Sequence, residues 1–125
     1  MSISRTIGFC LLSLAPALPA AAEENPLRLF ADCAGRLSAQ MEHQWLMSDP
    51  ASERTEAHRA AMLSLVDAVM TPDDGRDVLT WRIDAKQAHA VLLTRATFNK
   101  DAEDAAWAIE QAETHLAACT GLLLS

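Results

Sequence analysis

The sequence predicts an all-α protein: an antiparallel up-down-up-down four-helix bundle in which one disulfide joins the first and fourth helices. Three observations support this fold class. Apolar residues recur at intervals of three and four residues in four successive segments, the period of a helix that buries one face. Short breaks rich in Pro, Asp, Asn and Gly separate these segments, and two cysteines lie near the ends of the predicted domain. No alternating apolar–polar run is long enough to predict a strand.

Residues 1–22 have the pattern of a secretory signal peptide. Arg5 supplies the positive charge, Ile7–Leu18 is apolar, and Ala20–Ala22 gives an A-x-A cleavage pattern. A membrane anchor, the alternative, needs about 20 apolar residues to span a bilayer, more than this segment provides. We therefore expect the leader to be removed together with Cys10. Residues 23–125 are then expected to form one helical-bundle domain in the periplasm of a bacterial-type envelope, without a membrane span.

The first predicted helix begins at Asn25–Pro26, because Asn can cap a helix and Pro suits the first helical position. It ends before Ser48–Pro50, which interrupts the pattern and offers a cap for the next helix. Its apolar stripe consists of Leu27, Phe30, Cys33, Ala34, Leu37, Met41 and Trp45. We expect Trp45, at the edge of this stripe, to belong to the core.

The second predicted helix ends at Thr71–Gly75, the clearest turn in the chain because it combines Pro with Asp-Gly. Its apolar face consists of Ala61, Met62, Leu65, Val66, Val69 and Met70. The third helix is expected over Asp77–Phe98, and Asn99–Asp101 separates it from the fourth. The fourth has the stripe Ala105, Ile109, Ala112, Leu116 and Cys119, and Gly121 is expected to fray its end. The short connections favour antiparallel neighbours.

Cys33 and Cys119 are the two cysteines expected in the exported chain, and an even count in an exported protein indicates a disulfide. In the predicted topology, both cysteines lie roughly 10 Å from the same end of the bundle. A redox-active site is the alternative, but it would need a Cys-x-x-Cys pair or a lone activated thiol. We therefore predict a structural disulfide between the first and fourth helices.

The chain carries 17 acidic and 10 basic residues, a net charge of −7. This balance argues against a nucleic-acid-binding protein, which normally presents a basic face. The sequence also lacks a phosphate-binding Gly-rich loop, a G-x-S-x-G motif, an H-E-x-x-H motif and a C-x-x-C-H haem motif. We expect no catalytic residues and a non-catalytic function.

His58 and His89 form a candidate ligand-binding site. Folding the second and third helices about the turn places His58 opposite His89, at a level shared by Met41 and Gln111. Imidazole and thioether groups are suitable ligands for copper or haem. The alternatives are that the two histidines are hydrogen-bonded core or boundary residues, or that a shifted register leaves them exposed.

Arg82 and Lys86 follow the spacing of an inward-facing seam on the third helix. Such a basic strip suits an anionic ligand or the carboxylate of Asp67 on the second helix. Alternatively, both residues bury their aliphatic stems and extend their charges to solvent.

Trp107 points away from the apolar stripe of the fourth helix and lies among acidic residues. An exposed Trp is a typical anchor of a protein interface, although the amino-terminal segment or a second copy could cover it. The leading hypothesis is therefore an exported, non-catalytic protein that binds another envelope protein, not identified by the sequence, through a helix surface. The alternative is a copper- or haem-binding bundle built on His58, His89 and Met41. The sequence does not decide the oligomeric state.

Overall fold

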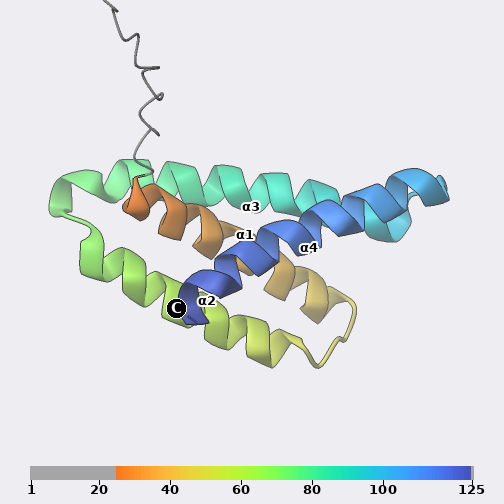
Figure 1. Cartoon of the computed structure of the whole chain (residues 1–125), viewed down its shortest axis with the longest axis horizontal. Helices are drawn as coiled ribbons and strands as arrows, with labels where there is room; N and C mark the ends of the chain where they lie inside the picture. Colours follow the sequence, from red (N-terminus) through yellow and green to blue (C-terminus); the bar gives the residue numbers. More distant parts are fainter. Residues whose placement is uncertain (1–24, 125) are drawn as a thin grey trace, which may run out of the picture.

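The computed structural model describes residues 25–124 and consists there of four α-helices and one 3₁₀ turn. The helices are α1 (Pro26–Leu46), α2 (Ser52–Val69), α3 (Gly75–Phe98) and α4 (Ala102–Leu124), with the turn η1 (Pro72–Asp74) between α2 and α3 (Figure 1). The predicted leader lies outside the described residues.

Local side-chain signals fix the start of α1 and the turn before α3 as the sequence predicts. The cap expected at Ser48–Pro50 is wrong, because α2 follows Ala51, which makes no side-chain capping bond, and α3 begins at Gly75 rather than Asp77. The Oδ1 atom of Asn25 accepts a hydrogen bond from the amide of Leu27 (3.1 Å), which caps α1. At η1, the amide of Thr71 donates to the Asp74 carboxylate (2.7 Å) in a capping box. This confirms the predicted turn between the second and third helices. The expected fraying at Gly121 is wrong, because α4 continues through it to Leu124.

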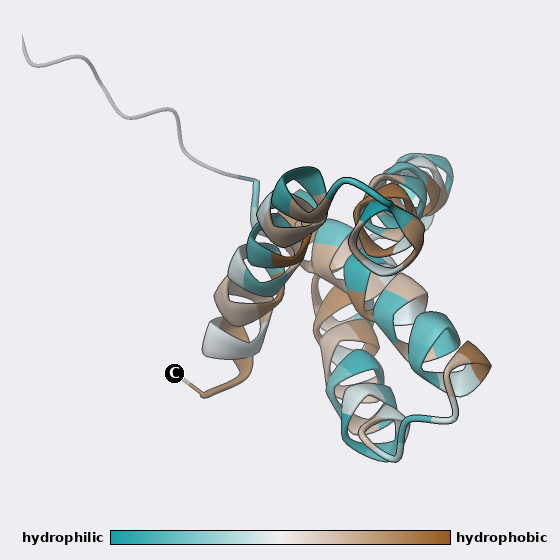
Figure 2. Ribbon diagram, turned by 90° about the vertical axis from the view of Figure 1, so that its right-hand side faces the viewer, coloured by the Kyte–Doolittle hydropathy of each residue, from teal (hydrophilic) through white to brown (hydrophobic). Residues whose placement is uncertain are grey.

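Helix α1 is the centre of the molecule. It packs most extensively against α3 and next against α2, whereas α4 packs mainly on α3. Figure 1 shows α4 crossing α1 at an angle, and Figure 2 shows the helix axes diverging rather than running parallel. The helices α2 and α3 are consecutive, yet their backbones do not approach each other closely. Their buried side chains Val66 and Val78 share one core cluster.

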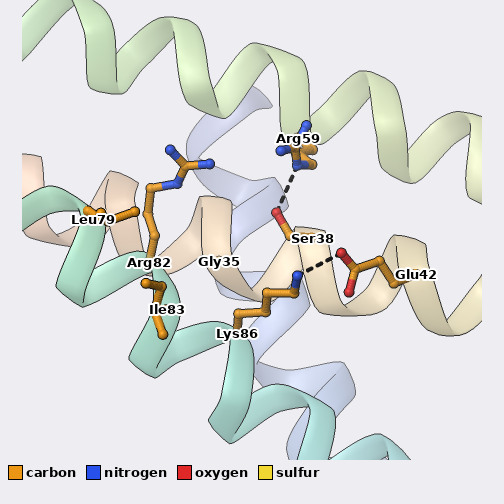
Figure 3. Close-up of a pocket in the computed structure, with 8 residues that line it drawn as sticks. All are labelled: Gly35, Ser38, Glu42, Arg59, Leu79, Arg82, Ile83 and Lys86. Carbon is orange, nitrogen blue, oxygen red and sulfur yellow. Dashed lines mark hydrogen bonds and ion pairs between the residues drawn. The ribbon is translucent and has the colours of Figure 1, made fainter.

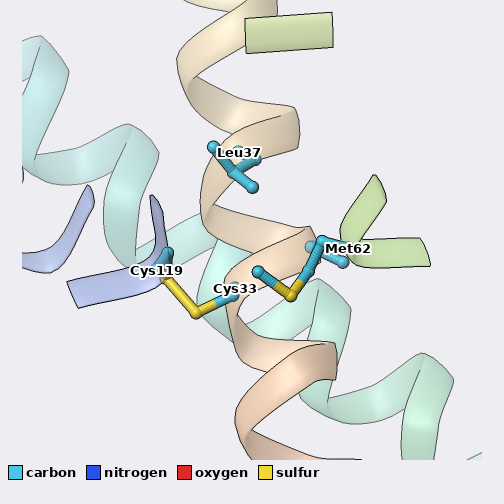
Figure 4. Close-up of a cluster of buried hydrophobic side chains, with 5 residues drawn as sticks. Cys33, Leu37, Met62 and Cys119 are labelled. Atoms are coloured by element: carbon cyan, nitrogen blue, oxygen red, sulfur yellow. A yellow bond between two sulfur atoms is a disulfide. The ribbon is translucent and has the colours of Figure 1, made fainter. Parts of the chain in front are cut away.

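The largest core cluster surrounds the predicted disulfide. Cys33 and Cys119 are linked, with 5.4 Å between their α-carbons, so the link between α1 and α4 is confirmed. Ala34, Leu37 and Met62 complete the buried cluster, and Figure 4 shows Leu37 and Met62 beside the disulfide. A second cluster lies nearer the start of α1 and consists of Leu27, Ala31, Val66 and Val78. Both clusters include α1, which explains why this helix is buried on more than one side.

Several residues of the predicted apolar faces are exposed instead, including Ala61 and Val69 on α2. The exposed fraction of Trp45 is 54%, because Gln44 occupies the inward position seven residues after Leu37. Ile109 is 41% exposed, because α4 buries the small residues Ala108 and Ala112. Small side chains let two helices approach closely. The predicted stripe is therefore confirmed at Ala112 and Cys119, whereas Ala108 takes the buried place expected for Ile109.

Among residues 25–124, no helix combines the length and the apolar character that a bilayer span requires.

Candidate functional site

A groove lies between α2 and α3, with α1 as its floor (Figure 3). The groove lies where α2 and α3 both pack on α1 while their backbones stay apart. Its volume is about 180 Å³. The residues that line it are Gly35, Ser38, Glu42, Arg59, Leu79, Arg82, Ile83 and Lys86. Because these residues come from three helices, we call this site the α2–α3 groove.

Three cations converge in the α2–α3 groove. Arg59 reaches in from α2, and its Nε atom donates a hydrogen bond to Oγ of Ser38 (2.7 Å). Lys86 on α3 forms an ion pair with Glu42 on α1, with 2.7 Å between Nζ and Oε1. Arg82 extends from α3 toward α2 (Figure 3) and has no ion-pair or hydrogen-bond partner among residues 25–124. The groove is therefore cationic within a protein of net charge −7.

The floor of the groove consists of small residues, because α1 and α3 approach each other closely there. A Cβ atom at Gly35 would clash with the main-chain carbonyl of Arg82 and lie 3.1 Å from the amide nitrogen of Lys86. Ser38, one turn later, is buried and donates to the Ala34 carbonyl (2.8 Å). This contact positions the two cations of α3 beside the floor.

Apolar side chains of α3 border the cations. Leu79 is 55% exposed and Ile83 is 45% exposed, and both line the groove. In a bundle with α2 packed on α3, these side chains would be buried between the two helices. Here they leave an apolar margin beside a cationic floor, a combination that suits an amphipathic ligand with negative charges.

Arg82 and Lys86, which the sequence predicts on one seam of the third helix, both line the groove. Their neighbours differ from those expected. The carboxylate that reaches Lys86 is Glu42 of α1 rather than Asp67 of α2. Arg59, which lies on α2, was not predicted from the sequence. The groove could have been anticipated from the small residues Gly35 and Ser38 inside the first helix, because small residues at that spacing predict a close helix contact.

The predicted layer of His58, His89 and Met41 required α2 to pack along α3, and the backbones of these two helices do not approach each other closely. His58 is half-buried on α2, while His89 is fully buried and faces α1. Met41 is buried in α1. In the region that the structure describes, no group of three or more His, Cys, Asp or Glu side chains is placed to hold a metal ion.

His89 belongs instead to a polar contact between α1 and α3. Its Nε2–H donates to Oε1 of Gln40 (3.1 Å). Its Nδ1 atom and Nη1 of Arg36 are buried without a partner within residues 25–124. Burial, together with the nearby charges of Arg36, His115 and His43, lowers the pKa of His89 to about 4. His89 is therefore neutral at physiological pH and holds the two helices in register.

Trp107 lies on the outer surface of α4, as expected, and is 47% exposed. The guanidinium carbon of Arg95 lies 4.9 Å from the centre of its ring, a cation–π contact. Arg95 is fixed in turn by Asp104, with 2.5 Å between Nη2 and Oδ1. One face of the ring is thus covered by Arg95.

The groove has binding groups but no catalytic constellation. None of its lining residues is His, Cys or Asp, and its single carboxylate is paired with Lys86. Guanidinium groups bind carboxylates and phosphates through paired hydrogen bonds, so the arrangement is suited to holding an anion. No family model, curated protein or solved structure shows a significant match to this chain.

Proposed function

We propose that this protein is an exported, non-catalytic binding protein, which holds an acidic segment of a partner protein in the α2–α3 groove. The observation that carries the proposal is Arg82. Its guanidinium extends into a groove that also contains Arg59 and Lys86, and it has no acidic partner within residues 25–124. A carboxylate from another molecule would supply the missing charge-assisted hydrogen bonds.

The size of the groove favours a protein segment over a small organic ligand. Pockets that enclose small molecules usually measure about 300–1,000 Å³, whereas this groove measures about 180 Å³. That volume suits one or two acidic side chains rather than a whole ligand. The exposed Leu79 and Ile83 can cover apolar side chains of the same segment, because an interface combines an apolar centre with a polar rim.

The proposal includes the location and the finer topology of the protein. The signal-peptide pattern of residues 1–22 supports export to the periplasm. The short connections 47–51, 70–74 and 99–101 support an antiparallel up-down-up-down order of the helices. In that order, the groove runs between two helices joined at one end and is open along its length.

Charge reversal in the groove tests the proposal. The processed protein is immobilised and exposed to an envelope extract of native-source cells, beside the variants Arg82→Glu and Arg76→Glu. Arg76 is the matched control, because it is an exposed arginine of the same helix outside the groove. We expect the protein itself and the control to retain the same acidic protein, Arg82→Glu to lose it, and high salt to release it. Equal retention by Arg82→Glu would contradict the proposal.

A further inference from the structure

We infer that the acidic segment is the outer face of α4 in a second copy of this chain. The inference rests on the proposed function, because it names the partner of the same groove. Helix α4 contains four acidic residues and no Lys or Arg. Among the described helices, only α4 contains neither Lys nor Arg, because α1, α2 and α3 each contain arginines.

The acidic residues of α4 share a face with its exposed aromatic residue. Glu103, Trp107, Glu110 and Glu113 are separated by four, three and three positions, so they lie along one side of a helix. All four are exposed, and we call them the acidic face of α4. Asp104 lies outside this face and pairs with Arg95. The three glutamates form no salt bridge with another residue of the described region.

The acidic face of α4 and the groove match in both charge and apolar character. Three carboxylates face solvent on one side, and the other side contains three cations, of which Lys86 is paired with Glu42. Trp107 supplies a large exposed side chain that can pack on Leu79 and Ile83. Tryptophan is among the residues that contribute most to protein interfaces, and complementary charges fix the register and partner choice.

The two surfaces lie on opposite sides of α1. In Figure 3, α4 passes behind α1 while the groove faces the viewer. The acidic face is directed away from the body, because the opposite side of α4 buries Ala108, Ala112 and Cys119. A contact between the groove of one copy and the acidic face of the next is therefore heterologous. Such contacts continue head to tail unless the assembly closes into a ring.

Sedimentation velocity of the processed protein over a concentration series tests this inference. At physiological ionic strength, we expect the weight-average mass to rise past that of a dimer, and to fall to that of the monomer in high salt. Arg82→Glu disrupts the groove, and Glu110→Arg disrupts the acidic face. Each is expected to weaken association at least about tenfold, because a like-charge contact replaces an attractive one. Arg76→Glu and Glu56→Arg, on exposed surfaces outside both sites, serve as matched controls.

Mixing the two variants gives the sharpest result. One intact junction remains possible, between the acidic face of Arg82→Glu and the groove of Glu110→Arg. The reversed junction again pairs opposite charges, at positions 82 and 110, so the mixture should associate more strongly than either variant alone. A protein that stays monomeric at millimolar concentration overturns this inference. So does association that is unchanged in Arg82→Glu.

Failure of this inference is distinguishable from failure of the proposed function. If the protein is monomeric but still retains an acidic envelope protein through Arg82, the partner is a different chain and the groove keeps its proposed role. If charge reversal at Arg82 changes neither association nor retention, both proposals are wrong.

Discussion

Gly35 of α1 faces the main-chain carbonyl of Arg82 on α3 so closely that no side chain fits between them. This contact links the packing of α1 and α3 to the geometry of the α2–α3 groove. The backbone of Arg82 is fixed against α1, while its side chain extends into the groove (Figure 3). The close approach of α1 and α3 therefore determines where the unpaired guanidinium lies.

Replacing Gly35 by Ala should destabilise the protein, although Ala is the better helix former. A clash with main-chain atoms cannot be relieved by a side-chain rotation, and overpacking costs about 1–3 kcal/mol. The gain in helix propensity is at most about 1 kcal/mol. Urea unfolding followed by circular dichroism should show a net loss of about 1–2 kcal/mol.

Gly121→Ala is the matched control for this experiment. An added Cβ at Gly121 meets no atom within 4 Å, so this variant should gain up to about 1 kcal/mol from helix propensity. Equal effects of the two substitutions would show that the close contact at Gly35 is absent in solution.

Removing the disulfide should lower the free energy of unfolding by about 4–5 kcal/mol. The two cysteines are separated by 86 residues, so the link greatly restricts the unfolded chain. The double variant Cys33→Ser, Cys119→Ser can be compared with the oxidised protein by urea unfolding. A loss below about 1 kcal/mol would contradict a structural role for the link.

Acidification should destabilise the protein through His89. Burial holds its folded-state pKa at about 4, below the ordinary value of 6.5. The unfolded state therefore binds the proton first, and stability falls as the pH drops from 6.5 to about 4. Over this window His89 accounts for a loss of about 3 kcal/mol. Above pH 6.5 its contribution is fully present.

The variant His89→Gln isolates this effect from the carboxylates that titrate at low pH. Unfolding free energies of the two proteins should differ in their slope with pH between 6.5 and 4. Burial also lowers the pKa of His115, so part of the slope should remain in the variant. Identical slopes would show that His89 is not buried in its neutral form.

Freeing Lys86 should strengthen binding of an acidic ligand. In Glu42→Gln the ion pair with Lys86 is lost, so the ammonium group no longer has a competing carboxylate. A half-exposed ion pair contributes roughly 0.2–1 kcal/mol, which corresponds to an increase in affinity of about 1.4- to fivefold. Fluorescence anisotropy with a labelled hexaglutamate peptide measures the change.

Asp67→Asn is the control for charge alone, because Asp67 is an exposed carboxylate of α2 outside the groove. It changes the net charge by the same amount as Glu42→Gln. An equal gain in both variants would assign the effect to net charge rather than to Lys86.

The local features of this fold could be predicted from the sequence. The cap at Asn25 and the turn at Thr71–Gly75 depend on neighbouring residues alone, and both are present. The disulfide was predictable because the sequence pattern predicts removal of the leader with Cys10, and the two remaining cysteines have a single possible pairing. These signals required no knowledge of how the helices pack.

The packing of the helices could not be predicted in the same way. Assigning levels by folding each hairpin assumes parallel helix axes, and the divergence of α2 from α3 removes the layer proposed for His58 and His89. Arg82 was found from its spacing along one helix. Arg59 was not, because its position in the groove depends on how α2 crosses α1.

The central claim, that the α2–α3 groove binds acidic segments through Arg82, is tested most directly by a nuclear magnetic resonance titration. The hexaglutamate peptide is added to the ¹⁵N-labelled processed protein, and amide shifts are followed in the protein itself, in Arg82→Glu and in Arg76→Glu. The account predicts saturable shifts centred on Gly35, Ser38 and Arg82, which persist in Arg76→Glu and disappear in Arg82→Glu. Absent shifts, or shifts of equal size in Arg82→Glu, would contradict it.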